Sequence, residues 1–233
     1  MTGTLINVGT VLLGTAIGTA FGARLAAGLQ QRVLAGLALV TLVLGIDNAL
    51  AWDTGHARTV LCVLGGVLLG GLAGEALGIE DALARVGDRI QARTGGAGVS
   101  QAFFTATLLF CVGPLTVVGA IDDGLRGDYQ LLATKAVLDG FASIALASAL
   151  GPGVGFAAIS VLVIQGGISL AAGLFDTVLK PGSEALAALT SAGGVLIIGI
   201  SLKLAELKDV RVGNFLPALV LAPALVGLAR ALA

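Results

Sequence analysis

Apolar runs of about 20 residues recur along the whole chain, and they constrain its fold more than any other feature. A helix that crosses the hydrocarbon core of a bilayer needs about 20 mostly apolar residues. Of the 233 residues, 57% are hydrophobic and 12% are charged, whereas soluble domains are about a quarter charged. The sequence therefore predicts an all-α polytopic membrane protein, a single membrane domain over residues 1–233 with about seven or eight transmembrane helices.

Eight apolar segments are predicted to span the membrane. They cover residues 3–23, 33–51, 59–78, 101–121, 131–150, 154–175, 186–204 and 214–230. Gly151-Pro152-Gly153 joins the fifth segment to the sixth, which predicts a tight turn and a helical hairpin, one arm of which could be re-entrant. Pro217 and Pro223 predict that the last span is kinked or broken.

Lysine and arginine are shared unevenly between the two sides that eight alternating spans define. Cationic residues are normally in excess in cytoplasmic loops. One side carries eight of them: Arg24, Arg32, Arg85, Arg89, Arg93, Lys203, Lys208 and Arg211. The other side carries five: Arg58, Arg126, Lys135, Lys180 and Arg230. This difference predicts that both termini lie outside, an assignment that a re-entrant segment would change.

A charged loop at residues 78–99 interrupts the apolar runs. Within it, apolar residues recur at helical spacing, while the charges occupy the other face; the apolar positions are Ile79, Leu83, Val86 and Ile90. This pattern predicts a short amphipathic helix that lies on the membrane or against a partner. A helix in a solvated loop is the alternative.

The first half of the chain contains a candidate internal repeat. GTVLLGTAIG at residues 9–18 resembles GGVLLGGLAG at 65–74, and IDNAL at 46–50 resembles IDDGL at 121–125. Residues 1–51 and 59–125 are therefore predicted to be two parallel copies of a two-helix unit.

Rows of glycines accompany this repeat, and Gly14, Gly18, Gly70 and Gly74 are predicted to lie at helix–helix contacts. A glycine stripe lets two helix backbones approach closely. The contact could lie within one subunit, in a homo-oligomer, or on a surface along which helices slide during transport.

Two charged residues lie inside an apolar run. Lys135 and Asp139 are four residues apart, so they share one helix face with Ser143 and can pair. A charged side chain at the bilayer centre costs about 3 kcal/mol and usually faces the bundle interior or a wet cavity. The pair is interpreted as the lining of a solute or proton path, or else as a structural ion pair.

Further polar residues complete the set of transport or ligand candidates. Asp47, Asp122 and Asp123 end the second and fourth spans at equivalent positions of the repeat, where they could flank a central cavity. Gln165 lies within an apolar run and needs a partner there; Asn7 is similar. For these amides, hydrogen bonds between helices are the alternative to ligand contact.

Other classes of function find little support. His56 is the only histidine and no CxxC motif is present, so no metal and no cofactor are expected. No basic patch suits a nucleic acid. A catalytic Ser/His/Asp set could form only around the loop residue His56, so the chain is not expected to be an enzyme.

Several strings resemble a known family. GTLINVGTVLLGTAIG, GAIDDGLRGDYQLLATKAVLDGFASIALASALG, QGG and GGVLIIGISLKLAELKDVRVGNFLPALV are similar to the YqgA/YdfK-like bacterial integral membrane proteins, domain of unknown function 554. The positions that match the family pattern are Asp123, Gly124, Gly127, Asp128, Lys135, Asp139, Gly140, Gln165 and Gly166. Asp122 and Lys203 depart from it, because the family has amides there. The resemblance implies a multi-pass protein of the bacterial cytoplasmic (inner) membrane.

Two hypotheses for the function follow. The first is a secondary transporter or permease for a small solute or ion, cationic or proton-coupled, because acids outnumber the lysine among the candidate residues. The second is a non-catalytic membrane protein that stabilises or regulates a partner, which the glycine rows and the amphipathic loop would also suit.

Overall fold

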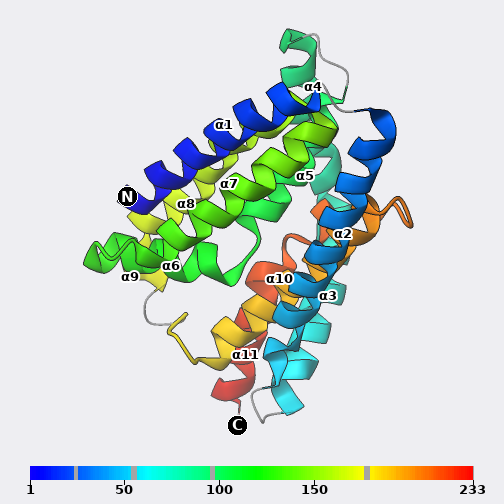
Figure 1. The fold of residues 1–233 in the computed structure, drawn as a ribbon. Coiled ribbons are helices and arrows are strands. Elements are labelled where there is room, and N and C mark those ends of the chain that lie inside the picture. Colours follow the sequence, from blue (N-terminus) through cyan, green and yellow to red (C-terminus); the bar gives the residue numbers. More distant parts are fainter. Residues whose placement is uncertain (24–25, 54–56, 95–97, 176–178, 233) are drawn as a thin grey trace.

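The computed structural model describes residues 1–23, 26–53, 57–94, 98–175 and 179–232, and every element in this part of the chain is a helix. Figure 1 shows their arrangement. The α-helices are α1 (Thr2–Gly22), α2 (Ala27–Ala49), α3 (Ala57–Leu77), α4 (Ile79–Thr94), α5 (Val99–Cys111), α6 (Pro114–Arg126), α7 (Gln130–Leu150), α8 (Ala157–Leu170), α9 (Ala172–Phe175), α10 (Glu184–Leu204) and α11 (Ala218–Ala231). Short 3-10 helices are η1 (Leu50–Trp52), η2 (Pro152–Phe156) and η3 (Val212–Phe215).

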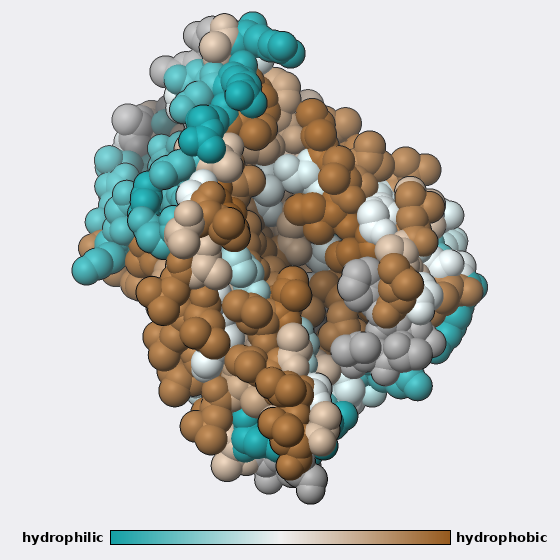
Figure 2. Space-filling model, turned by 180° about the vertical axis from the view of Figure 1, so that it is seen from behind, coloured by the Kyte–Doolittle hydropathy of each residue, from teal (hydrophilic) through white to brown (hydrophobic). Residues whose placement is uncertain are grey.

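Seven segments of the described chain are long and apolar enough to cross a membrane, and there are eight if the bent pair α5–α6 forms one span. The seven are Thr2–Gly22, Gly28–Trp52, Ala57–Leu77, Gln130–Leu150, Pro152–Leu170, Glu184–Leu204 and Val212–Ala231. The predicted all-α membrane fold is therefore confirmed. Figure 2 shows brown, apolar surface over the middle of the molecule, with hydrophilic residues gathered over α4 and the segment 206–211.

Helices from the two ends of the chain pack together. α1 lies along α7, α2 along α10 and α3 along α11, while α8 packs against α1, α5 and α6. Figure 1 shows α1, α7 and α8 as one group and α2, α3, α10 and α11 as another. A shared core joins the two groups, since Val11, Phe110 and Leu146 belong to the same apolar cluster as Leu196.

The glycine row of α1 faces α7. A Cβ atom at Gly14 would collide with the backbone of Gly140, and one at Gly18 with that of Ile144. The contacts advance in the same direction along both helices, so α1 and α7 run parallel. Only glycine allows this separation of the two backbones.

The glycine row of α3 faces α11 in the same manner. A Cβ atom at Gly70 would collide with Ala218, and one at Gly74 with the carbonyl oxygen of Asn214. Here the residue numbers run in opposite directions, so α3 and α11 are antiparallel. All four predicted glycines thus lie at helix–helix contacts within one subunit.

The fourth predicted span, 101–121, is not one straight helix. α5 ends at Cys111, α6 begins at Pro114, and the two axes differ by 63°. Proline has no N–H to continue the ladder and its ring disfavours a preceding helical turn, but it suits the first position of a new helix. The broken helix is therefore here and not in the pair 131–150 and 154–175.

The predicted turn between the fifth and sixth spans is present, but the two helices do not pack as a hairpin along their length. Gly151 has a φ of 84°, and η2 follows it before α8. α1 lies between the two helices, since its Asn7 bonds to both Asp139 on α7 and Gln165 on α8. The last predicted span is divided into two helices. The 3-10 helix η3 precedes α11, with Pro217 at the N-cap of α11 and Pro223 inside it.

The amphipathic segment forms α4, which packs against α5 and η3. Gly87 faces Ser100 of α5, and Leu83 is half-buried, whereas Val86 is exposed. Its apolar face therefore covers the protein's own helices in part, and whether the rest meets lipid or a partner stays a prediction.

Both termini lie at the same end of the bundle. Gly3 at the start of α1 bonds to Asp123 near the end of α6, and Ile121 of α6 belongs to the same apolar cluster as Ala185 at the start of α10. Arg230 near the end of α11 lies 3.2 Å from Glu184, the first residue of α10. α2 runs antiparallel to α10, because Ser201 bonds to Ala38 while Gly194 meets Ala49. The C-terminal ends of α2 and α6 therefore share this end, as the repeat requires, although the repeat itself stays a prediction.

Candidate functional site

An ion pair lies inside the bundle on α7. The ammonium group of Lys135 contacts Oδ2 of Asp139, as their spacing predicts, and both side chains are about nine-tenths buried. Burying one charge alone is costly, and pairing within the same helix face lowers that cost. The Lys135–Asp139 pair therefore forms the centre of the candidate site.

Two amides extend the pair across three helices. Asn7 Nδ2 on α1 donates to Asp139 Oδ2 at 2.9 Å and to Gln165 Oε1 on α8 at 3.0 Å. Gln165 Nε2 in turn donates to the Thr4 hydroxyl on α1 at 3.2 Å. Asn7 and Gln165 are fully buried. The sequence marked each amide separately, but the role of Thr4 and the links between the three helices could not be read from it.

Some polar atoms around this network have no partner. Asn7 Oδ1 and Ser143 Oγ are buried without a hydrogen bond to any described residue. An unsatisfied buried polar atom costs about 1–3 kcal/mol, and such atoms in a native structure call for a functional or structural reason. The network thus retains capacity for further hydrogen bonds.

A cavity of about 860 Å³ lies between α2 and α7 and reaches the ion pair. We call it the α2–α7 cavity. Its polar lining consists of Thr41, Asp47, Asn48, Thr116, Lys135 and Asp139, and the remaining lining is apolar apart from glycine. Asp47 is exposed and has no hydrogen bond or ion pair with the described residues. Of the four acids proposed from sequence, the structure brings Asp47 and Asp139 together in this cavity.

The break between α5 and α6 borders the same cavity. Val112, Gly113 and Thr116 line it, and the Thr116 hydroxyl donates to the carbonyl oxygen of Phe110 at 3.1 Å. A broken helix presents free backbone groups and a positive helix end inside the bundle. In transporters, such discontinuous helices form substrate and ion sites.

Asp122 and Asp123 lie elsewhere. Asp122 pairs with Arg126 at 3.1 Å on the same helix. The buried Asp123 accepts a hydrogen bond from Gly3 N at 3.1 Å and lies 2.9 Å from the amino group of Met1. Asp123 thus caps α1, where a negative charge offsets the helix dipole. The expectation that these two acids flank a cavity together with Asp47 is wrong for the α2–α7 cavity, because only Asp47 lines it while Asp122 and Asp123 are bound to Arg126 and to the start of α1.

Gln165, a transport or ligand candidate from the sequence, does not line the cavity either. Its two amide atoms are directed toward Asn7 and Thr4 instead. It can act on the cavity only through Asn7, which shares a hydrogen bond with Asp139.

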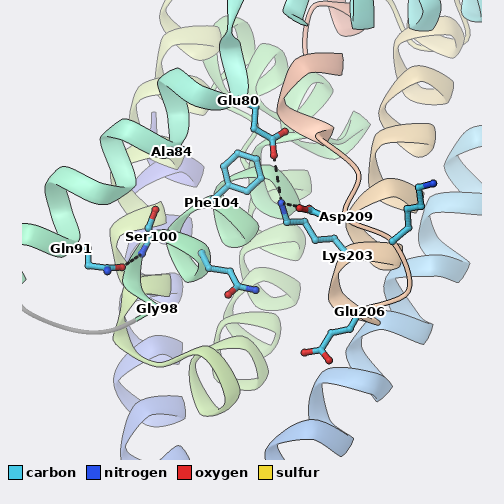
Figure 3. Close-up of a pocket in the computed structure, with 11 residues that line it drawn as sticks. Glu80, Ala84, Gln91, Gly98, Ser100, Phe104, Lys203, Glu206 and Asp209 are labelled. Carbon is cyan, nitrogen blue, oxygen red and sulfur yellow. Dashed lines mark hydrogen bonds and ion pairs between the residues drawn. The ribbon is translucent and has the colours of Figure 1, made fainter.

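A second polar cluster holds α4 against α10 at the other end of the bundle. Figure 3 shows Lys203 between Glu80 and Asp209, at 3.5 and 2.9 Å, beside the ring of Phe104. Its ammonium nitrogen is 5.2 Å from the ring centroid, a cation–π distance. Glu80 also accepts a hydrogen bond from Gly213 N at 2.8 Å. The residues border a cavity of about 580 Å³, and they secure α4 in place.

No group of three or more His, Cys, Asp or Glu among the described residues is placed to hold a metal ion. The predicted loop position of His56 lies outside those residues. The two cysteines, Cys62 and Cys111, are buried and free.

Comparison with known proteins gives relatives over nearly the whole length. The family model described as protein of unknown function DUF554 matches residues 2–227. The uncharacterized membrane protein YdfK of Bacillus subtilis (strain 168) is 29% identical over 226 residues, which are 97% of this chain and 96% of YdfK. The uncharacterized protein YqgA of Escherichia coli (strain K12) is 30% identical over 223 residues, 94% of either chain. No solved structure matches.

Proposed function

The chain belongs to the DUF554 family of proteins of unknown function, and from this premise we propose that it is a secondary transporter or permease for a small solute, cationic or proton-coupled. One observation carries the proposal. A buried ion pair, Lys135–Asp139, lines a cavity inside a membrane-spanning bundle at the break between two half-helices. Intramembrane charges of this kind are costly and are usually retained for solute or proton paths.

The geometry supports an exchange at Asp139. Its Oδ2 atom accepts from Lys135 and Asn7, so a proton or a solute cation that binds the carboxylate competes with the Lys135 ammonium. Loss of the Lys135–Asp139 contact would weaken the hydrogen-bonded link that runs from α7 through Asn7 to α1 and α8. Binding would in this way change how the three helices are held together, as alternating access requires.

The net charge of the groups that line the cavity favours the binding of a cation. Two carboxylates, Asp47 and Asp139, face one ammonium, that of Lys135, in the lining of the cavity. The excess negative charge attracts cations and disfavours anions in a site with apolar walls.

Flux across a liposome membrane tests the proposal. The purified protein would be reconstituted, and uptake of a panel of labelled small cations would be followed with and without a pH gradient. Uptake by the native protein and its loss in Asp139→Asn are expected. Asp122→Asn is the matched control, since that acid lies outside the cavity and pairs with Arg126. Full uptake by Asp139→Asn would reject the site.

If no solute in the panel crosses the membrane, the result favours the second hypothesis, which is a non-catalytic membrane protein that stabilises or regulates a partner. In that case Asp139→Asn would change the stability of the protein, and no flux would depend on it.

A further inference from the structure

Half of the Asp139 carboxylate is unused. Lys135 and Asn7 both bond to Oδ2, and Oδ1 has no hydrogen bond with the described residues, although Asp139 lines the α2–α7 cavity. Asp47 adds a second carboxylate without a partner among those residues. A donor with one positive charge would satisfy Oδ1 and neutralise the excess charge of the cavity.

The walls of the cavity are apolar, and its mouth is too. Leu44, Leu138 and Phe141 line it and are themselves between half and three-quarters exposed. Exposed apolar side chains on membrane-spanning helices face hydrocarbon. The cavity therefore opens sideways between α2 and α7, and it offers apolar surface to whatever occupies it.

The size and chemistry of the cavity argue against a bare inorganic cation. A hard cation such as Ca²⁺ or Mg²⁺ takes about six or more oxygen ligands at close range. The described residues contain no cluster of three acidic or other metal-binding side chains. A cavity of about 860 Å³ instead lies in the range typical of organic ligands, about 300–1,000 Å³.

We propose that the α2–α7 cavity binds a monovalent organic amine with an apolar body. The ammonium group donates to Asp139 Oδ1 and is drawn in by Asp47, while the alkyl part lies on the walls and enters from the bilayer side. This inference rests on the proposed transport function of the same cavity and specifies its ligand class.

Binding to the purified protein in lipid nanodiscs at about pH 7 tests the ligand class. The probes are hexylammonium, the neutral hexanol and the anionic hexanoate, each measured by calorimetry. Hexylammonium binds, and the other two bind about tenfold more weakly or worse, because only the cation completes a charge-assisted hydrogen bond. Equal binding of hexanol or hexanoate would overturn the proposal.

Two variants locate the binding site. Asp139→Asn weakens hexylammonium binding about tenfold or more, while Asp122→Asn binds like the native protein. If Asp139→Asn does not fold, Gly36→Leu replaces it: Gly36 lines the cavity and a Cβ there meets nothing within 4 Å, so a leucine is expected to occupy part of the cavity. Gly9→Leu, equally unobstructed but outside the cavity, is its control. Unchanged binding by Gly36→Leu would overturn the proposed location.

The outcomes separate this inference from the proposed function. If another solute shows uptake that depends on Asp139 but hexylammonium does not bind, the ligand class is wrong and transport stands. If hexylammonium binds in the cavity but neither an amine nor any other cation of the panel crosses the liposome membrane, the ligand class stands and transport fails.

Discussion

Asp139 is the residue on which the polar core depends, because a single carboxylate oxygen receives both Lys135 and Asn7. The ion pair offsets the cost of two buried charges, and the amide connects it to Gln165. Removing one charge leaves the other buried without compensation, whereas removing both leaves a smaller and mostly apolar defect.

A double-mutant cycle tests this dependence. Lys135→Ala or Asp139→Ala alone is expected to destabilise the protein by about 3–5 kcal/mol, and the double variant by less than either. Thermal unfolding of the purified proteins in detergent gives the comparison. Equal stability of the two single variants and the double variant would contradict the pairing.

Asn7 is expected to matter for stability as a donor to two acceptors. Asn7→Ala leaves the oxygen atoms of Asp139 and Gln165 short of one hydrogen bond each, a loss of about 1–3 kcal/mol. Thr134→Ala is the control, because that exposed hydroxyl donates to the carbonyl oxygen of Gln130 in the preceding turn of its own helix. If both variants unfold at the same temperature, Asn7 is not part of a stabilising network.

At the scale of the helices, the glycine rows fix how closely α1 approaches α7 and α3 approaches α11. The collisions that a Cβ atom would cause involve backbone atoms, which have no rotamer to escape into. Any residue other than glycine at these positions must therefore push the two helices of the pair apart.

Gly70→Leu is accordingly expected to prevent folding or to lower the unfolding temperature strongly. Gly9→Leu, on the open side of α1, is expected to change it little, since surface substitutions stay within about 0.5 kcal/mol. Thermal stability in detergent is the measurement. An unaltered Gly70→Leu protein would show that the row does not set the packing.

The spans and the glycine contacts could be predicted from the sequence because apolar length and small-residue spacing are local properties. The Lys135–Asp139 pair is local as well, since one helical turn separates the two residues. The partner of each helix could not be predicted: Asn7 and Asp139 are 132 positions apart, and no short-range pattern encodes such a contact. Pro114 is a local indication of the break at Gly113-Pro114, but the long apolar run around it favoured one continuous span.

For the whole molecule, the position of the charges gives an orientation. α4 and the segment 206–211 carry most of the exposed cationic residues at one end, and both chain termini lie at the other. Because cationic loops normally lie on the cytoplasmic side of a membrane, we expect both termini to lie on the opposite side.

Cysteine labelling in spheroplasts tests this orientation. The native thiols of Cys62 and Cys111 are buried, so the background is low. Leu232→Cys, at an exposed position beside the C-terminus, is expected to react with a membrane-impermeant maleimide. Lys208→Cys reacts only after permeabilisation. The reverse pattern would invert the topology.

The pairing of early helices with late ones has a consequence for biogenesis. α1, α2 and α3 leave the ribosome long before α7, α10 and α11, so their glycine rows and Asn7 must wait in the bilayer without their final partners. Contacts of such large sequence separation form slowly. The early helices must therefore enter the bilayer before their partners are made, and two fragments divided at Gly127–Tyr129 are expected to complement each other when they are synthesised together in one cell.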